Sequence, residues 1–315
     1  MAPIARLAFF GTPDFAVPTL AALVNAGRRP LLVVAQPDRP AGRGRSLQKP
    51  PVARFAEHAG LALEQPESVR DPEFLARLEA LALDVAVVVA FGQIFPVRLL
   101  EAPRLGCVNV HASLLPAYRG AAPIQAAVAA GATETGVTTM RMEKGLDSGP
   151  IYLERSLAIG PEETSGELST RLATEGASLL LETLDRLETG DLEARPQADA
   201  LATYAPRLDR EAGRADWSLP AARLADRLRA FTPWPGLTAR LRGEPVKIVA
   251  ARAAPGAATL EPAGSWLGLV DGALHVACGE GSVLAVSELQ RPGRRALAAA
   301  DFANGERLAR GECFA

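Results

Sequence analysis

Cysteine is scarce in this chain of 315 residues, and its copies are scattered. The three cysteines form no Cys-x-x-Cys pair; they are Cys107, Cys278 and Cys313. Histidine is equally rare, with three copies and no His-Glu-x-x-His motif. Because structural zinc and disulfide frameworks need clustered or regularly spaced ligands, neither is expected here. The sequence therefore predicts a protein without a metal centre.

Long apolar runs are also missing. No segment reaches the roughly 20 apolar residues that a membrane-spanning helix needs. The chain begins MAPIARLAFFGTPDF, which passes from one basic residue directly into a strand-like run and lacks the regions of a secretory signal peptide. With 48% hydrophobic and 22% charged residues, the composition fits a globular protein with a substantial core. We expect a cytoplasmic protein that does not associate with membranes.

The glycine-rich fingerprint of dinucleotide-binding proteins is missing as well. The segment FGTPDF, which follows the first strand-like run, is not Gly-x-Gly-x-x-Gly. The Gly-x-Gly within AGRGR, residues 41–45, follows no strand-to-helix turn. No dinucleotide site is therefore expected.

Charge is unevenly distributed along the chain. Residues 1–200 hold 19 basic and 24 acidic side chains, a net of −5, whereas residues 201–315 hold 15 and 12, a net of +3. An asymmetry of this size often arises by chance, and charge alone favours that interpretation. The alternative is that the C-terminal part faces a polyanion.

Strand-like and helix-like segments alternate through the first half. Apolar runs such as VAVVVAFG and GCVNVHAS are separated by segments with helical spacing, among them DPEFLARLEALALD with Asp71 as N-cap and Pro72 at the first helical position. This order predicts an open, largely parallel, Rossmann-like sheet covered by helices on both faces. Such sheets bind ligands beyond the carboxyl ends of their strands, where VVVAFGQ and VNVHAS turn polar.

The second half has a different pattern. Residues 133–160 predict two alternating strands joined by a glycine-rich loop, and residues 165–188 predict a long helix. Short β-type runs separated by turn residues fill the last hundred residues, which predicts a small C-terminal β-barrel of the OB-like kind. We therefore expect an N-terminal domain over 1–189, a linker over 190–208 and the barrel over 209–315.

The stretch NVHASLLPAYRG, residues 109–120, concentrates polar chemistry at the end of a predicted strand. Asn109 and His111 are two residues apart, so their side chains point to one face of the strand. An amide beside an imidazole can stabilise a developing oxyanion and handle a proton near neutral pH. Asp147, in the loop KGLDSGP, could return to the same edge and orient His111. A histidine with a purely structural role is the alternative.

These motifs together resemble the folate-dependent formyltransferase family. NVHASLLPAYRGAAPIQ and TGVTTMRMEKGLDSG are similar to the core motifs of the family, and FFGTPDFAVPTL, VVVAFGQIFP and DWSLPAARLADRLRAFTPWPG extend the similarity in the same order. The resemblance covers nearly the whole chain. The AGRGR loop, the WPG segment and ELQRPGRRALAAADFANG narrow it to members that act on initiator tRNA.

The resemblance implies a reaction and its participants. The formyl group of 10-formyltetrahydrofolate, a co-substrate, would pass to the α-amine of initiator methionyl-tRNA, with no metal involved. The substrate amine would attack the formyl carbon, Asn109 and protonated His111 would stabilise the tetrahedral oxyanion, and Asp147 would hold His111. The resemblance also implies folate-binding residues at Phe91, Gly92, Gln93, Ile94, Ser113, Leu114, Leu115 and Pro116.

The loop DRPAGRGRSLQK, residues 38–49, carries several positive charges. Its composition alone is typical of a solvated surface loop. The resemblance instead implies that it enters the acceptor end of the tRNA through Arg39, Arg43, Arg45 and Lys49. It likewise implies a tRNA-facing barrel and a monomeric protein.

Two departures from the family pattern leave alternatives open. Ala117 and Ala126 stand where many members carry arginine, which removes positive charge near the site. A related enzyme that formylates an amino-sugar nucleotide would share the catalytic residues, and a sibling hydrolase would use water as the acceptor. A non-catalytic RNA-binding relative would have no evident use for Asn109, His111 and Asp147.

Overall fold

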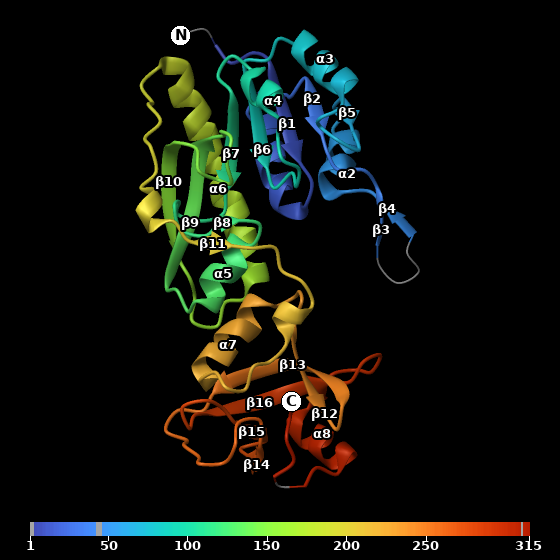
Figure 1. Ribbon diagram of the computed structural model, residues 1–315. Helices are drawn as coiled ribbons and strands as arrows, with labels where there is room; N and C mark the ends of the chain where they lie inside the picture. Colours follow the sequence, from blue (N-terminus) through green and yellow to red (C-terminus); the bar gives the residue numbers. More distant parts are fainter. Residues whose placement is uncertain (1–2, 42–45, 310) are drawn as a thin grey trace. The chain divides into compact units, whose positions relative to one another are not determined.

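The computed structural model describes residues 3–41, 46–309 and 311–315 (Figure 1). The chain divides into two compact units. The first comprises Met1–Pro123, Glu134–Ala158 and Ser169–Ala205, and the second comprises Ile124–Thr133, Ile159–Leu168 and Pro206–Ala315. Within the described part of the chain, no helix is both long enough and apolar enough to cross a membrane.

The first unit is built on a seven-stranded sheet with the order β10-β9-β7-β6-β1-β2-β5. Its strands are β1 (Leu7–Gly11), β2 (Leu32–Val34), β5 (Leu63–Glu64), β6 (Val85–Val89), β7 (Cys107–His111), β9 (Glu134–Arg141) and β10 (Ile151–Ala158). The five strands from β7 to β5 are parallel, and β9 and β10 add an antiparallel edge. The predicted open, largely parallel sheet is confirmed.

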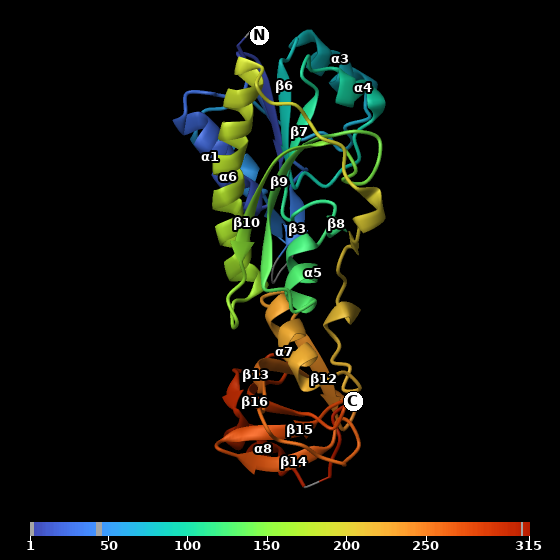
Figure 2. The ribbon, with the colours of Figure 1, turned by 90° about the vertical axis from the view of Figure 1, so that its left-hand side faces the viewer.

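Helices cover both faces of this sheet, as Figure 2 shows for α1 (Val17–Asn25) and α6 (Ser165–Thr189) on one side and α3 (Pro72–Ala80) and α4 (Val97–Glu101) on the other. Phe9 packs in a cluster with residues of α1, α2 and α6, whereas its neighbour Phe10 packs in a second cluster with residues of α3 and α4. Alternate strand residues thus serve opposite faces, which is why the central strands are apolar throughout. The helices are α1 (Val17–Asn25), α2 (Pro51–His58), α3 (Pro72–Ala80), α4 (Val97–Glu101) and α6 (Ser165–Thr189).

Local sequence signals set some of these boundaries. The side chain of Asp71 accepts a hydrogen bond from the backbone N–H of Glu73 at 3.2 Å, and Pro72 opens α3, as predicted. The remaining short elements of the first unit are η1 (Asp14–Ala16), β3 (Arg39–Ala41), β4 (Ser46–Gln48), β8 (Arg119–Gly120), η2 (Asp199–Leu201) and β11 (Tyr204–Ala205). All of α5 (Pro123–Ala129) except its first residue belongs to the second unit.

Residues 190–205 belong to the first unit and are joined to the rest of it by backbone hydrogen bonds. Ile151 and Arg195 exchange two backbone hydrogen bonds of 2.8 Å, and β11 pairs in parallel with β8. The segment lacks hydrophobic periodicity because its contacts are made by the backbone and by single polar side chains.

The second unit contains an antiparallel sheet with the order β12-β13-β16-β15-β14, and β17 also pairs with β16. Its elements are η3 (Glu211–Gly213), α7 (Ala221–Ala230), β12 (Leu237–Leu241), β13 (Glu244–Ala253), β14 (Trp266–Val270), β15 (Ala273–Ala277), β16 (Val283–Gln290), β17 (Leu297–Ala298) and α8 (Ala299–Glu306). The chain end bonds to both edges, through Ala315 with Arg240 of β12 and Glu312 with Trp266 of β14. These bonds link the two edge strands, and the barrel-like C-terminal domain is confirmed.

Candidate active site

Asn109 and His111 lie at the carboxyl end of β7, in the middle of the first unit's sheet. Both are buried, with 8% and 6% of their surfaces exposed, and strand alternation places them on the same face. Among the described residues, the Asn109 side chain has no protein hydrogen-bond partner, so its amide N–H₂ group is available to a ligand. An uncommitted amide donor at a sheet edge suits an oxyanion or carbonyl oxygen.

Asp147 returns to this edge from the loop between β9 and β10. Its Oδ2 lies 3.7 Å from His111 Nδ1 and accepts a hydrogen bond of 2.8 Å from the backbone N–H of Gly120. The residue has a φ of +50°, a left-handed conformation that non-glycine residues adopt uncommonly. The fold thus holds the carboxylate beside the imidazole despite an unfavourable backbone conformation.

The imidazole of His111 faces an acceptor on each side. Nε2 lies 3.1 Å from the carbonyl oxygen of Tyr118, and Nδ1 faces the carboxylate of Asp147. A carbonyl oxygen only accepts hydrogen bonds, so Nε2 carries a proton. The neutral ring would then leave Nδ1 bare toward a negative charge, whereas the imidazolium satisfies both sides.

The structure reveals two polar residues that the sequence did not single out, Arg119 and Gln197. The guanidinium of Arg119, whose residue is only 4% exposed, donates to Oε1 of Gln197 at 3.0 and 2.7 Å and to Oδ1 of Asp199 at 2.6 Å. The amide of Gln197 donates to the backbone carbonyls of Asp147 and Gly149 at 2.8 and 2.7 Å.

These contacts close a ring of interactions around the Asp147 loop. The side chain of Arg119 reaches the main chain of Asp147 through Gln197, while the backbone of the next residue, Gly120, binds its carboxylate. The arginine of AYRG stands beside the predicted site and could have been suspected from that position. Gln197 carried no signal, because it lies in the segment expected to be a linker.

The predicted folate residues that follow β7 form a firmly held turn. The hydroxyl of Thr138 donates to the carbonyl of Ser113 at 2.6 Å and accepts from the N–H of Leu115 at 3.2 Å. The Ser113 hydroxyl donates to the carbonyl of Ala117 at 2.6 Å, and Leu115 packs in a small buried cluster with Met140 and Ile151. Pro116 follows a cis peptide bond. The hydroxyl of Ser113 and the side chain of Leu115 are thus already engaged by the protein.

The predicted folate residues that follow β6 leave the same sheet edge, since Val88 pairs with Asn109. The ring of Phe91 is buried against Phe10 and Phe95, and the amide of Gln93 binds backbone groups of Val69 and Glu67. Ile94 is 77% exposed, and Gly92 has a φ of +89°. The groups of this segment that a ligand can contact are therefore the side chain of Ile94 and the backbone, rather than the side chains of Phe91 or Gln93.

The basic loop is a hairpin of β3 and β4, of which the structure describes the two ends. Arg39 is exposed, whereas the ammonium of Lys49 is paired with Glu57 of α2. The hydrogen bond that this ammonium donates to the carboxylate of Glu57 raises the pKa of Lys49. Arg43 and Arg45 lie outside the described residues. Lys49 is thus largely neutralised, so the positive character of the hairpin depends on its arginines.

A covalent mechanism has no support at this site. Cys107 starts the same strand as Asn109, but burial raises the pKa of its thiol to about 12. A thiol of this kind is hardly ionised at neutral pH and is a poor nucleophile.

Comparison with known proteins assigns the chain to a family. Residues 5–184 match the family model "Formyl transferase", and residues 207–307 match "Formyl transferase, C-terminal domain". A protein of Synechococcus sp. named methionyl-tRNA formyltransferase is 50% identical over 319 residues, which cover 98% of each chain.

Solved structures of similar fold are more distant in sequence. HypX from Aquifex aeolicus, solved with tetrahydrofolic acid, has a TM-score of 0.62 at 15% identity over 96% of this chain, which spans about half the length of HypX (47%). The sugar 3N-formyl transferase WlaRD has a TM-score of 0.67 at 15% identity and covers 93% of this chain and 100% of its own. At this identity the two structures support the fold alone. The chain belongs to the formyl transferase family, among the proteins named methionyl-tRNA formyltransferase.

Proposed function

We propose that this protein transfers the formyl group of 10-formyltetrahydrofolate to the α-amine of initiator methionyl-tRNA, giving formylmethionyl-tRNA for translation initiation. The observation that carries the proposal is the arrangement of Asn109, His111 and Asp147 at the sheet edge of a chain similar over its full length to methionyl-tRNA formyltransferases.

The proposed chemistry is direct transfer. The amine of the methionyl ester attacks the formyl carbon, a new C–N bond forms, and the carbonyl oxygen becomes an oxyanion. Asn109 donates to that oxygen and the charge of His111 stabilises it, which removes the need for solvent reorganisation. The bond to N10 of the folate then breaks, N10 gains a proton and the amine loses one. Asp147 keeps the imidazolium oriented throughout.

The folate donor would bind at the edge where β6 and β7 end. We assign its contacts to the residues predicted from the resemblance, Phe91 to Ile94 and Ser113 to Pro116. Because Phe91 and Gln93 already have protein partners, their contribution would come from the backbone, and Ile94 and Leu114 would provide apolar contact. A pteridine ring is flat and rich in hydrogen-bonding groups, which suits exposed backbone beside apolar side chains.

The tRNA would contact two regions. Arg39, Arg43 and Arg45 of the basic hairpin, with a small contribution from Lys49, would bind phosphates at the acceptor end. We assign residues 1–189 to catalysis, 190–208 to the connection and 209–315 to tRNA binding. The protein would act as a monomer in the cytoplasm, where translation begins.

The test is formyl transfer from 10-formyltetrahydrofolate with three acceptors in parallel: initiator methionyl-tRNA, free methionine and an amino-sugar nucleotide. We expect product with the charged tRNA alone, at rates well above loss of formyl to water. Product with only the amino-sugar nucleotide would support the proposed chemistry of the site but refute the assignment of tRNA as acceptor. Loss of formyl without any acceptor would indicate a hydrolase.

A further inference from the structure

The carbonyl of Phe91, in the segment assigned to the folate donor, is held by two side chains that come from other strand ends. The hydroxyl of Thr12, which follows β1, donates to this oxygen at 3.0 Å. The amide of Gln36, which comes shortly after β2, donates to the same oxygen at 3.2 Å. The backbone N–H of Gln36 in turn donates to the Thr12 hydroxyl at 3.4 Å. Three neighbouring strands, β6, β1 and β2, thus each supply one member of a small polar cluster.

The segment that carries Phe91 has a backbone conformation that needs such support. Ala90 has a φ of +47° and Gly92 a φ of +89°, so left-handed residues flank Phe91 on both sides. That conformation is costly for an alanine and persists where surrounding contacts enforce it. The rings of Phe10 and Phe95 fix the side chain of Phe91, and the two hydrogen bonds to its carbonyl fix the peptide that follows.

The same two hydrogen bonds set the direction of the next backbone N–H. The peptide bond between Phe91 and Gly92 is trans, so its carbonyl and its N–H point in opposite directions. Because the carbonyl faces Thr12 and Gln36, the N–H of Gly92 points away from both side chains. Gly92 is exposed, and among the described residues its N–H has no protein hydrogen-bond partner. This donor is therefore available to a ligand at the edge of the sheet.

We propose that Thr12 and Gln36 are positioning residues of the donor site, which hold the Phe91–Gly92 peptide so that the N–H of Gly92 donates to an oxygen or ring nitrogen of the folate. The inference rests on the proposed function, because it takes the folate as the ligand of this segment. Thr12 and Gln36 act through the peptide and need no contact with the ligand. The pteridine ring does not react, so its binding contributes equally before and during transfer. Loss of the two side chains should therefore weaken donor binding and leave the chemical step intact.

Binding of 5-formyltetrahydrofolate, whose formyl group is on N5 rather than N10, tests the inference without any formyl transfer. Thr12→Val and Gln36→Leu each remove one donor and keep the bulk of the side chain. We expect each to raise the Kd roughly fivefold, about the effect of one lost hydrogen bond. The double variant should raise the Kd by more than the product of the single effects, because neither donor then remains to compensate for the other.

The pattern of recovery and of kinetic constants separates positioning from other roles. Thr12→Ser keeps the hydroxyl and should bind the folate as the wild type does. In the formyl transfer assay, the Thr12→Val/Gln36→Leu variant should show a raised KM for the folate donor, while kcat and the KM for tRNA stay near the wild-type values. A lowered kcat at saturating donor, with the KM for the donor unchanged, would contradict the inference.

A buried threonine of α6 gives a matched control for stability. The hydroxyl of Thr183 lies 2.8 Å from that of Thr139 and donates to the carbonyl of Leu179 at 2.7 Å. Thr183→Val removes the same chemical group and should lower the unfolding midpoint without changing the Kd for the folate. If Thr12→Val/Gln36→Leu behaved in this way too, the two residues would serve the fold alone and the inference would be wrong.

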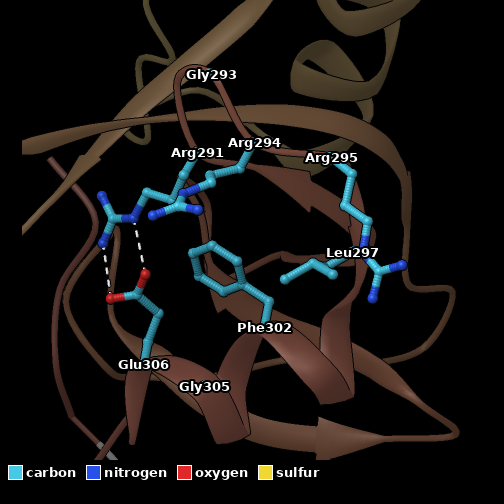
Figure 3. A pocket seen from close by; sticks show the side chains of 8 residues that line it. All are labelled: Arg291, Gly293, Arg294, Arg295, Leu297, Phe302, Gly305 and Glu306. Atoms are coloured by element: carbon cyan, nitrogen blue, oxygen red, sulfur yellow. Dashed lines mark hydrogen bonds and ion pairs between the residues drawn. The ribbon is translucent and has the colours of Figure 1, made fainter.

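A second control concerns where the folate binds, because the ligand is an anion with a flat ring. In the second unit, a cavity of about 600 Å³ lies where the loop after β16 meets α8 (Figure 3). In Figure 3 the side chains of Arg294 and Arg295 lie on opposite sides of the Phe302 ring. Arg294→Ala/Arg295→Ala should leave the Kd for the folate unchanged. A Kd raised as much as in Thr12→Val/Gln36→Leu would mean that the measured binding takes place in this cavity, which would overturn the inference.

Three outcomes distinguish failure of this inference from failure of the proposed function. Wild-type protein that binds the folate but forms product only with the amino-sugar nucleotide would refute the tRNA assignment and leave the positioning role standing. Wild-type protein that binds the folate, beside a Thr12→Val/Gln36→Leu variant with an unchanged Kd, would refute the positioning role alone. Wild-type protein that binds no reduced folate would refute both.

Discussion

At the scale of single residues, the site depends on where protons and charges are held. His111 lies between two hydrogen-bond acceptors, the carbonyl of Tyr118 and the carboxylate of Asp147. An imidazolium at this position would stabilise an oxyanion that develops beside it.

His111→Ala should lower kcat by about 10²- to 10³-fold, the usual effect of removing one oxyanion-stabilising group. Folate binding should survive, because its proposed contacts lie on the neighbouring segments. Single-turnover assays would measure the rate of formyl transfer, and titration with the folate donor would measure its binding. The matched control is His58→Ala, which removes an exposed histidine of α2 and should leave both kcat and folate binding unchanged. Near-normal turnover in His111→Ala would refute the assigned role.

Gln197→Ala should act through the Asp147 loop. The loss removes both hydrogen bonds that hold the carbonyls of Asp147 and Gly149 and leaves buried Arg119 with Asp199 alone. Displacement of the loop should lower kcat roughly 10- to 100-fold, because small errors in position are costly in catalysis. The KM for tRNA should not change. If Gln197 had a purely structural role, the substitution would lower the unfolding midpoint and leave kcat unchanged. The unfolding midpoint and kcat are therefore both measured.

At the scale of elements, the strands and their order were largely predictable. VAVVV and LAFFG are apolar throughout because helices cover both of their faces, and Asp71 caps α3 as its sequence indicates. The closure of the β-barrel was not predictable in detail. It depends on backbone bonds from Glu312 and Ala315 to two edge strands, and backbone bonds leave no hydrophobic pattern.

The candidate site was predictable only in part for a similar reason. Asn109, His111 and Asp147 carry recognisable chemistry at recognisable positions. Gln197 does not, because its importance arises from contacts with residues about 50 and 78 positions away in the sequence. The segment around it has no periodicity, and a hydrogen bond between distant side chains cannot be inferred from composition. The structure therefore adds Gln197 and Arg119, which contact the Asp147 loop, to the site residues that the sequence predicts.

The basic hairpin gives a prediction at this scale. Arg43→Ala should raise the KM for tRNA roughly tenfold, a plausible effect of losing a charge-assisted phosphate contact. The KM for the folate donor should stay nearly constant. Lys49→Ala should have a smaller effect on tRNA, because Glu57 already neutralises this ammonium. Equal losses for both substrates in Arg43→Ala would count against a tRNA role for the hairpin.

At the scale of the whole molecule, one ion-pair cluster ties the start of the first unit to the end of its longest helix. Glu188 of α6 accepts from the N–H of Ile4 at 2.6 Å and from Arg28 at 3.0 and 2.6 Å. The hydrogen bond from Arg28 lowers the pKa of Glu188 below its ordinary value. The carboxylate of Glu188 therefore binds a proton less readily in the native state than in the unfolded chain.

Stability should consequently depend on pH through Glu188. Its contribution is fully present above the ordinary glutamate pKa and is lost as the pH falls through the lower pKa of the folded state. Glu188→Gln should reduce the unfolding midpoint at neutral pH, and the difference from the wild type should shrink in acid. Thermal unfolding of both proteins, followed from neutral to acid pH, measures this difference in midpoint. Asp185→Asn, at a partner of Arg28 that is 65% exposed, should have little effect. A constant difference at every pH would contradict the argument.

The three cysteines have a practical consequence for measuring this enzyme. Cys107 and Cys278 are buried, with thiol pKa values raised to about 12 and about 11, whereas Cys313 is exposed where the chain end pairs with Ser265. A maleimide fluorophore at neutral pH should therefore label the native protein once, at Cys313, as mass spectrometry of peptides would verify. The dye would sit on the RNA-binding half of the proposed enzyme, and wild-type protein could report tRNA association without any engineered thiol.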